Sequence, residues 1–148
     1  NTKIKINFER NIYALYAAEI SDKFAPFNLE NTAKYDLIMR IWEILGICEY
    51  PKRALTAFTL RFLKVSGYSF SDYLNNNDVF IDEKIKKTIK KLSNCSRYEV
   101  DLLQKIEDEK VWNYVESYIT NYIRRPSLSI FLTKISNTFK FKFKKTVL

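Results

Sequence analysis

The chain has 148 residues, 47% of them hydrophobic and 28% charged, which is enough for one folded domain with a buried core. It has only two glycines and three prolines, too few for the many tight turns of an all-β sandwich or barrel, and no apolar run of about 18 residues that would span a membrane. The net charge of +8, with its basic excess after residue 50, would attract phosphate or an acidic peptide, and the lack of any histidine excludes a histidine-based catalytic group.

Apolar residues recur at intervals of three and four, which predicts a mostly α fold: a single helical-bundle domain, residues 1–148, of about six to seven helices. The first helix stops at Pro26, and the second runs from about Glu30 to Ile47. The first is expected to bury Phe8, Ile12, Leu15, Tyr16, Ile20 and Phe24. The second is expected to bury Ala33, Leu37, Ile38, Ile41, Trp42 and Leu45.

The third helix has clear start and stop signals. Pro51 suits a first helical position, where the missing N–H costs nothing, and Gly67 supplies the left-handed residue that closes a helix. The expected apolar stripe consists of Leu55, Phe58, Phe62 and Val65, with Leu63 beside it.

Residues 69–81 break the pattern and predict an irregular loop with a short strand. Asp82 then caps a helix with a narrow apolar seam of Ile85, Ile89 and Leu92. Ser96 and Glu99 form a capping box that opens a further helix. That helix is expected to carry Leu102, Leu103 and Ile106 and to be interrupted by the acidic segment EDEK, residues 107–110.

The last part of the chain predicts a helix that ends at Pro126 and a short helix over 129–135. The first of these is expected to bury Val111, Trp112, Val115, Tyr118, Ile119 and Tyr122. The basic tail, residues 136–148, alternates Phe and Lys and predicts either an edge strand or a disordered arm.

The two cysteines, Cys48 and Cys95, lack a CxxC spacing. They are interpreted as two buried free thiols of a reducing cytoplasm, and the alternative is a disulfide of a secreted protein.

Three stretches of the chain match the motifs of one known family, in the family's order. The central helix and its stop match at Phe58, Leu60, Leu63, Gly67, Tyr68 and Leu74. An earlier helix matches at Tyr13, Leu15, Tyr16, Glu19 and Ile20. A closing motif matches at Tyr122, Arg125, Pro126, Leu128, Ser129 and Phe131. Together these stretches resemble the RecO recombination mediators of bacteria.

The resemblance implies the helical C-terminal domain of such a mediator. The N-terminal oligonucleotide-binding fold would be absent from this chain, and we expect a fragment because the sequence starts at Asn1 rather than at Met. The family has a zinc site, but Asn75, Asn76 and Asn77 stand where many members have a cysteine, so no metal or other cofactor is expected.

The resemblance also implies a function. The protein would bind single- and double-stranded DNA, anneal strands and break no bonds itself. Its partners would be the acidic tail of the single-strand DNA-binding protein, RecR and, indirectly, the RecA recombinase. It would work in the bacterial cytoplasm, associated with the nucleoid during repair.

The lysines that surround the narrow seam after Asp82 are the first candidates for DNA contact. They are Lys84, Lys86, Lys87, Lys90 and Lys91. Phosphate contacts release counterions, so such binding would weaken steeply with salt. The alternative is a solvated face in a lysine-rich sequence.

Two further groups of cations follow. Lys140, Lys142, Lys144 and Lys145 alternate with phenylalanines, which suits single strands because bases stack on rings while lysines follow the backbone. The alternative packs these rings on the core and leaves the lysines in water. Arg124 and Arg125 end a helix, where cations complement the helix dipole, and their place in the closing motif suggests a role with DNA or a partner.

An acidic peptide with a bulky apolar end needs an apolar notch rimmed by cations. The third helix predicts such a groove for the tail of the single-strand DNA-binding protein, formed by Arg53, Arg61, Phe62, Leu63 and Lys64.

Other classes of function stay open. One is a helical adaptor whose lysines only make it soluble. Another is a basic amphipathic helix on anionic lipid, for which residues 84–91 have the charge but too narrow an apolar face. An enzyme is not expected, because the sequence has no Gly-rich phosphate loop, metal-ligand cluster or serine elbow.

Overall fold

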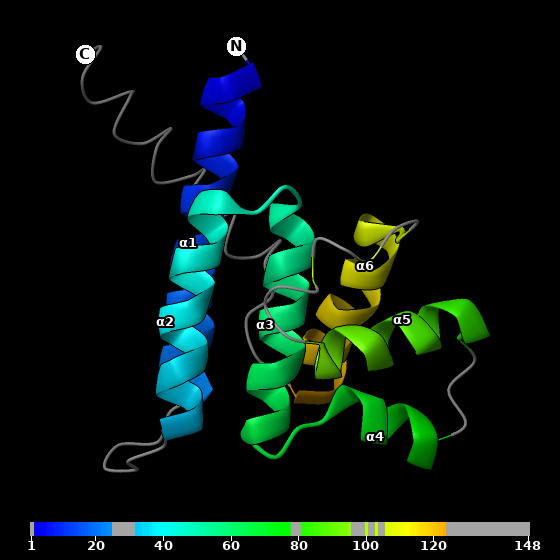
Figure 1. Ribbon diagram of the computed structural model, residues 1–148. Helices are drawn as coiled ribbons and strands as arrows, with labels where there is room; N and C mark the ends of the chain where they lie inside the picture. Colours follow the sequence, from blue (N-terminus) through cyan, green and yellow to red (C-terminus); the bar gives the residue numbers. More distant parts are fainter. Residues whose placement is uncertain are drawn as a thin grey trace, which may run out of the picture.

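The computed structural model describes residues 2–24, 32–77, 81–95, 100, 103 and 106–123, with the side chains of 2–6, 122 and 123 left out. These residues form helices α1 (Thr2–Phe24), α2 (Thr32–Ile47), α3 (Pro51–Val65), α4 (Phe70–Asn76), α5 (Glu83–Asn94) and α6 (Asp108–Tyr118). A π-helical turn, Ile119–Ile123, continues α6 (Figure 1). No strand occurs among the described residues, which confirms the predicted mostly α, single-domain fold.

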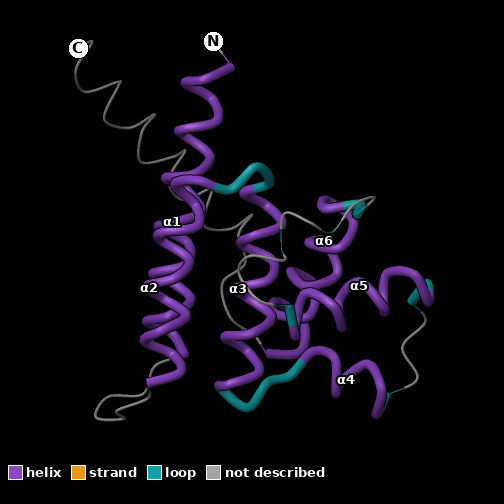
Figure 2. Tube along the Cα trace, viewed as in Figure 1, coloured by secondary structure: helices purple, strands orange, loops and turns teal. Residues whose placement is uncertain are grey.

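Helix α3 runs through the middle of the molecule. Figure 2 shows α1 and α2 side by side on one flank of α3, and α4, α5 and α6 on the other. All five of these helices contact α3. The eight consecutive residues Arg53–Leu60 are buried, as expected for a helix that is surrounded on every side. The hydroxyls of Thr56 and Thr59 are satisfied within the helix, because each donates to a carbonyl one turn earlier at 2.8 Å.

Both ends of α3 agree with the sequence prediction. Pro51 occupies the first turn. At the other end Gly67 has a φ of +90°, and the Tyr68 N–H donates to the Leu63 carbonyl at 2.8 Å while the Gly67 N–H donates to the Lys64 carbonyl at 3.2 Å. This is a Schellman stop, which only a residue free to take positive φ forms without strain.

The buried faces of α1 and α2 are narrower than predicted. Tyr16, Ile20 and Ile41 are in the core, but Phe8, Leu15 and Ala33 are exposed and Trp42 is 52% exposed. Among the described elements α1 and α2 pack against each other and against α3, and the residues at the edges of their apolar stripes face solvent. Val65, in the last turn of α3, is also exposed, because the helix leaves the core there.

The predicted irregular loop at 69–81 is wrong in part, since residues Phe70–Asn76 form α4. The Ser69 hydroxyl caps the helix by accepting from the Asp72 N–H at 3.3 Å. Phe70 and Leu74 are one turn apart and buried, and the Phe70 ring stacks on Tyr118 with centroids 4.4 Å apart. This contact with α6 stabilises a helix too short to show a period in the sequence.

Helix α5 follows the prediction, and the segment after it does not. Asp82 caps α5 by accepting from the Lys84 N–H at 3.0 Å, and the seam residues Ile85, Ile89 and Leu92 are buried. Leu103 and Ile106 lie outside any helix, which corrects the helix predicted there. The acidic residues Glu107, Asp108 and Glu109 stand at the start of α6 instead of interrupting a helix, because carboxylates favour the positive end of the helix dipole.

Both cysteines are buried and free, as interpreted from the sequence. The predicted capping box at Ser96, the helix end at Pro126, the short helix over 129–135 and the tail 136–148 lie outside the described residues.

Candidate nucleic-acid interface

Helix α5 presents most of its lysines to solvent. Its apolar seam packs into the core, so Lys84, Lys87, Lys90 and Lys91 are exposed and Lys86 is half-buried. The helix carries five lysines and one acidic residue, Glu83, a net charge of +4. Within the described part of the chain none of these ammonium groups forms an ion pair. They are therefore available to an external anion.

The lysine face of α5 continues onto α3. The Lys64 ammonium donates to the Asn94 side-chain oxygen at 3.1 Å, which joins the ends of the two helices. Asn94 lies four residues after Lys90 and seven after Lys87, so the three share one side of α5. We call Lys87, Lys90, Asn94 and Lys64 the basic stripe.

A groove between α2 and α3 opens at the end of this stripe. Its volume is about 530 Å³. The walls carry three cations, Arg40, Arg61 and Lys64, and one carboxylate, Asp36. The remaining lining residues are Ala33, Leu37, Val65 and Ser93. We call this space the α2–α3 groove; its net charge is positive and much of its lining is apolar.

An apolar recess adjoins the α2–α3 groove. Leu37, Arg40 and Arg61 line both spaces, and the recess reaches inward to Ile41, Ile44, Ala57 and Phe58. Its free volume, about 30 Å³, is close to that of a single small group. A ligand in the groove thus meets cations at the rim and hydrocarbon behind them.

The structure corrects the groove that the sequence predicted on α3 alone. Phe62 and Leu63 are both 0% exposed, and Arg53 is 4% exposed, so none of the three reaches a surface ligand. Helical phase turns Phe62 and Leu63 toward the core. Arg53 lies about three turns before Lys64 on nearly the same side of α3, and it is buried because Asp108 and the segment before α6 cover that end of the helix. The sequence missed Arg40, which comes from a helix that only the tertiary fold places opposite Arg61.

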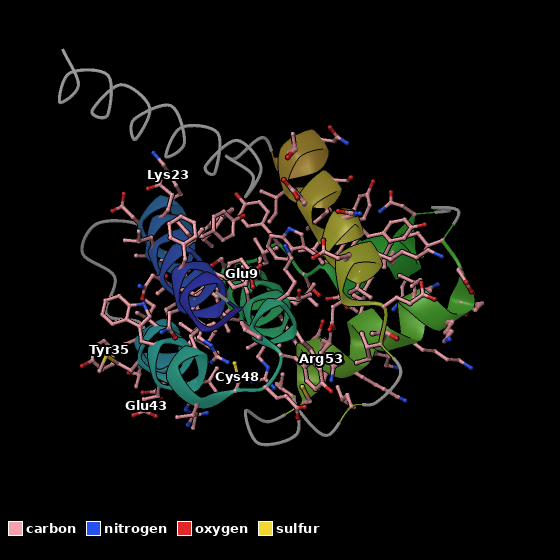
Figure 3. All side chains as sticks on the ribbon, turned by 90° about the horizontal axis from the view of Figure 1, so that it is seen from above. Glu9, Lys23, Tyr35, Glu43, Cys48 and Arg53 are labelled. Atoms are coloured by element: carbon pink, nitrogen blue, oxygen red, sulfur yellow. The ribbon has the colours of Figure 1, made fainter. Side chains whose placement is uncertain are left out.

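Arg53 has a structural role in place of the predicted binding role (Figure 3). Its Nε and Nη2 donate to the two oxygens of Asp108 at 3.0 and 3.3 Å, and its Nη1 donates to the carbonyl of Leu103. The guanidinium carbon also lies 4.1 Å from the centre of the Tyr50 ring. The side chain fastens the start of α6 and the segment before it to α3.

Among the described residues, the groups with clearly shifted pKa values are tyrosines of the core. Burial raises the pKa of Tyr13 to about 12, and the Glu9 and Glu109 carboxylates add to this shift. Burial, with a smaller effect of Glu116, raises the pKa of Tyr16 above its ordinary value. Among the residues that the structure describes, no group of acidic residues and cysteines is placed to hold a metal ion.

The outer face of α2 is apolar and was not anticipated. Tyr35, Met39 and Trp42 follow each other at helical spacing, and all three are exposed. A hollow of about 360 Å³ lies beside Trp42, between α1 and α2. Sequence periodicity did not reveal this face. The spacing of apolar residues shows that a helix has an apolar stripe, but it does not show which edge of that stripe a neighbouring helix covers.

The other predicted cations, Arg124, Arg125, Lys140, Lys142, Lys144 and Lys145, lie outside the described residues.

Comparison of the chain with protein-family models, with curated proteins and with solved structures finds no match.

None of the described helices combines the length and the apolar character that crossing a membrane requires.

Proposed function

We propose that this chain binds DNA as a recombination mediator similar to the RecO family. The observation that supports the proposal is the lysine face of α5, which has no ion pairs within the described residues and continues through Lys64 to the α2–α3 groove. The proposal includes strand annealing, engagement of the single-strand DNA-binding protein and RecR, and promotion of RecA loading in gap repair. It implies a bacterial cytoplasmic protein without bond-breaking activity.

The dimensions of α5 suit a polyanion. Its 12 residues extend for about 18 Å at the rise of an α-helix. One DNA strand presents a phosphate about every 3.4 Å of axis, so this length spans about five phosphates. The four exposed lysines of α5 would neutralise most of that charge.

The α2–α3 groove is the site that we propose for the acidic tail of the single-strand DNA-binding protein. Such a tail needs cations for its carboxylates and a recess for its apolar end. Arg40, Arg61 and Lys64 supply the cations, and Leu37 supplies an apolar wall beside the recess. Arg61 and Lys64 were predicted for this role from the sequence. The residues predicted with them, Arg53, Phe62 and Leu63, are buried, and Arg40 and Leu37 of α2 line the groove in their place.

Charge reversal on α5 tests the DNA-binding proposal. Lys87→Glu combined with Lys90→Glu removes two phosphate contacts, so the slope of log affinity against log salt should become shallower by about 1.4 for single-stranded DNA. At about 50 mM salt the affinity should fall by at least about tenfold. Fluorescence anisotropy of a labelled oligonucleotide over a salt series measures both quantities.

The matched control carries the same change in net charge elsewhere. Lys23→Glu combined with Lys110→Glu alters exposed lysines of α1 and α6, away from the basic stripe. Its affinity should stay within about threefold of the unmodified chain, since only long-range attraction is lost. Equal losses in the two double variants would show that binding follows net charge alone and would refute the α5 site.

A protein-interaction adaptor is the alternative function. The observation that favours it is the exposed apolar face of α2, Tyr35, Met39 and Trp42, because exposed patches of this kind mark interaction sites. The adaptor function predicts no binding either to DNA or to anionic lipid vesicles. DNA binding with a steep salt slope and no vesicle binding would exclude it as the sole role.

A further inference from the structure

We propose that the basic stripe and the α2–α3 groove act as one anion-binding surface, so that bound DNA and a bound acidic peptide weaken each other's binding. This inference rests on the proposed function and adds the regulation of its two sites. The two ligands would compete for cations that the fold has placed in a single row.

Lys64 is the residue that links the two sites. It lines the α2–α3 groove together with Ser93 of α5, and its ammonium group donates to Asn94, the neighbour of Ser93. Lys90 lies four residues, about 6 Å along the helix axis, before Asn94. A phosphate chain that follows Lys87 and Lys90 along α5 therefore meets Lys64 next, at the rim of the groove.

The positive charge where the basic stripe meets the α2–α3 groove is too small to neutralise two polyanions at once. The groove has three cations and one carboxylate, Asp36, so its net charge is +2. A peptide with several carboxylates uses that charge fully. Phosphates at Lys90 would then lie within about one Debye length of those carboxylates, about 10 Å at 0.1 M salt, where the repulsion is only partly screened.

The competition has a direction that follows from the different contacts of the two ligands. DNA gains its affinity from counterion release, which weakens as salt rises. The peptide also buries an apolar end in the recess beside Leu37, and that contribution is insensitive to salt. Low salt and abundant free DNA should therefore favour release of the peptide, and high salt should favour its retention.

Coupling between the two ligands is reciprocal and can be measured from either side. Anisotropy of a labelled oligonucleotide at about 50 mM salt gives the DNA affinity with and without a saturating acidic peptide that ends in an apolar residue. We expect the peptide to weaken DNA binding by about tenfold, and DNA to weaken peptide binding by the same factor. A peptide with the same charge and its apolar end replaced by glycines should have little effect.

Ala33→Phe separates the two sites. Ala33 is exposed and lines the groove, so a neutral ring there takes up groove volume while every cation of the stripe and the groove is kept. The variant should lose about tenfold in peptide affinity, and the same peptide concentration should no longer weaken its DNA binding. Circular dichroism checks that the variant is folded.

The outcomes separate this inference from the proposed function. An unchanged DNA affinity while the peptide is bound would mean independent sites and would overturn the inference, while DNA binding itself would stand. Equal inhibition by the glycine-ended peptide, or persistent competition in Ala33→Phe, would show general polyanion competition and would also overturn it. A chain that binds no DNA in the absence of peptide would refute the proposed function directly.

Discussion

Arg53, Arg61 and Lys64 lie on the same helix, yet their surroundings give them different roles. Arg61 and Lys64 line an open groove, whereas Arg53 is buried against Asp108 and the carbonyls of the segment before α6. Arg53 and Lys64 lie on nearly the same side of α3, about three turns apart, so the elements that cover each end of the helix determine whether its cation can reach a ligand. A buried, fully bonded guanidinium is important for stability, because removing it leaves a carboxylate and carbonyls without their donors.

Replacing Arg53 by alanine is therefore expected to lower the free energy of unfolding by about 3 kcal/mol. Urea denaturation followed by circular dichroism measures the loss. Lys110→Ala is the control, since it removes only the exposed pair with Glu107 and should cost about 0.5 kcal/mol or less. A cost for Arg53→Ala no greater than that of the control would mean that the buried ion pair does not hold α6 to α3.

At the scale of the elements, Gly46 and Gly67 have similarly open surroundings but different backbone conformations. A Cβ added to Gly46 or to Gly67 would meet nothing within 4 Å. Gly46 has helical neighbours within α2, whereas Gly67 has a φ of +90° in the stop of α3. A Gly→Ala substitution at either position therefore changes stability through backbone conformation, because the added methyl group meets no neighbouring atom.

Gly67→Ala should lower the free energy of unfolding by about 1–2 kcal/mol, because an L-residue is strained in the left-handed region. Gly46→Ala should raise it by about 0.5–1 kcal/mol, because alanine loses less backbone entropy in a helix. Thermal and urea unfolding of both variants give the two values. If both substitutions changed the free energy of unfolding in the same direction, the stop of α3 at a left-handed Gly67 would be contradicted.

At the scale of the whole molecule, the first and last described helices share one aromatic core. The Tyr16 ring of α1 meets the edge of Trp112 of α6 with centroids 5.8 Å apart. The Lys52 ammonium of α3 lies 5.3 Å from the centre of the Tyr13 ring and 5.8 Å from that of Trp112. Ionisation of a tyrosine in this core would therefore affect the packing of three helices.

This core predicts a loss of stability at alkaline pH. The pKa of Tyr13 in the folded chain is about 12 against an ordinary value of 10, so the folded state retains the proton longer than the unfolded state. The stabilisation is fully present below pH 10 and is lost as pH rises toward 12. Tyr16 changes in the same direction.

Melting curves from pH 8 to 12 should therefore fall less steeply for Tyr13→Phe than for the unmodified chain. Tyr35→Phe is the matched control, because Tyr35 is exposed and its ring lies outside the core. Its alkaline loss should equal that of the unmodified chain. A Tyr13→Phe variant with the same pH dependence as this control would show that Tyr13 ionises equally easily in both states.

The sequence by itself determined the features that depend on a few neighbouring residues. Pro51, Gly67 and Asp82 set helix ends through local backbone chemistry, and the seam Ile85, Ile89 and Leu92 fixed the inward face of α5. Because the seam faces the core, the lysines on the opposite side of α5 face solvent, and these lysines form the larger part of the candidate DNA surface. These features were predictable because their causes lie within one or two helical turns.

Only the tertiary structure decided which edges of the apolar stripes are covered and which distant residues meet. Trp42 and Val65 belong to apolar stripes, but both side chains are exposed in the folded chain. The pairing of Arg53 with Asp108 joins residues 55 positions apart, and Arg40 meets Arg61 only across two packed helices. Arg61 and Lys64 of the α2–α3 groove were predicted, but its second wall on α2 and its junction with α5 had no signal in the sequence. Their geometry arises from the packing of helices and not from the pattern within any one of them.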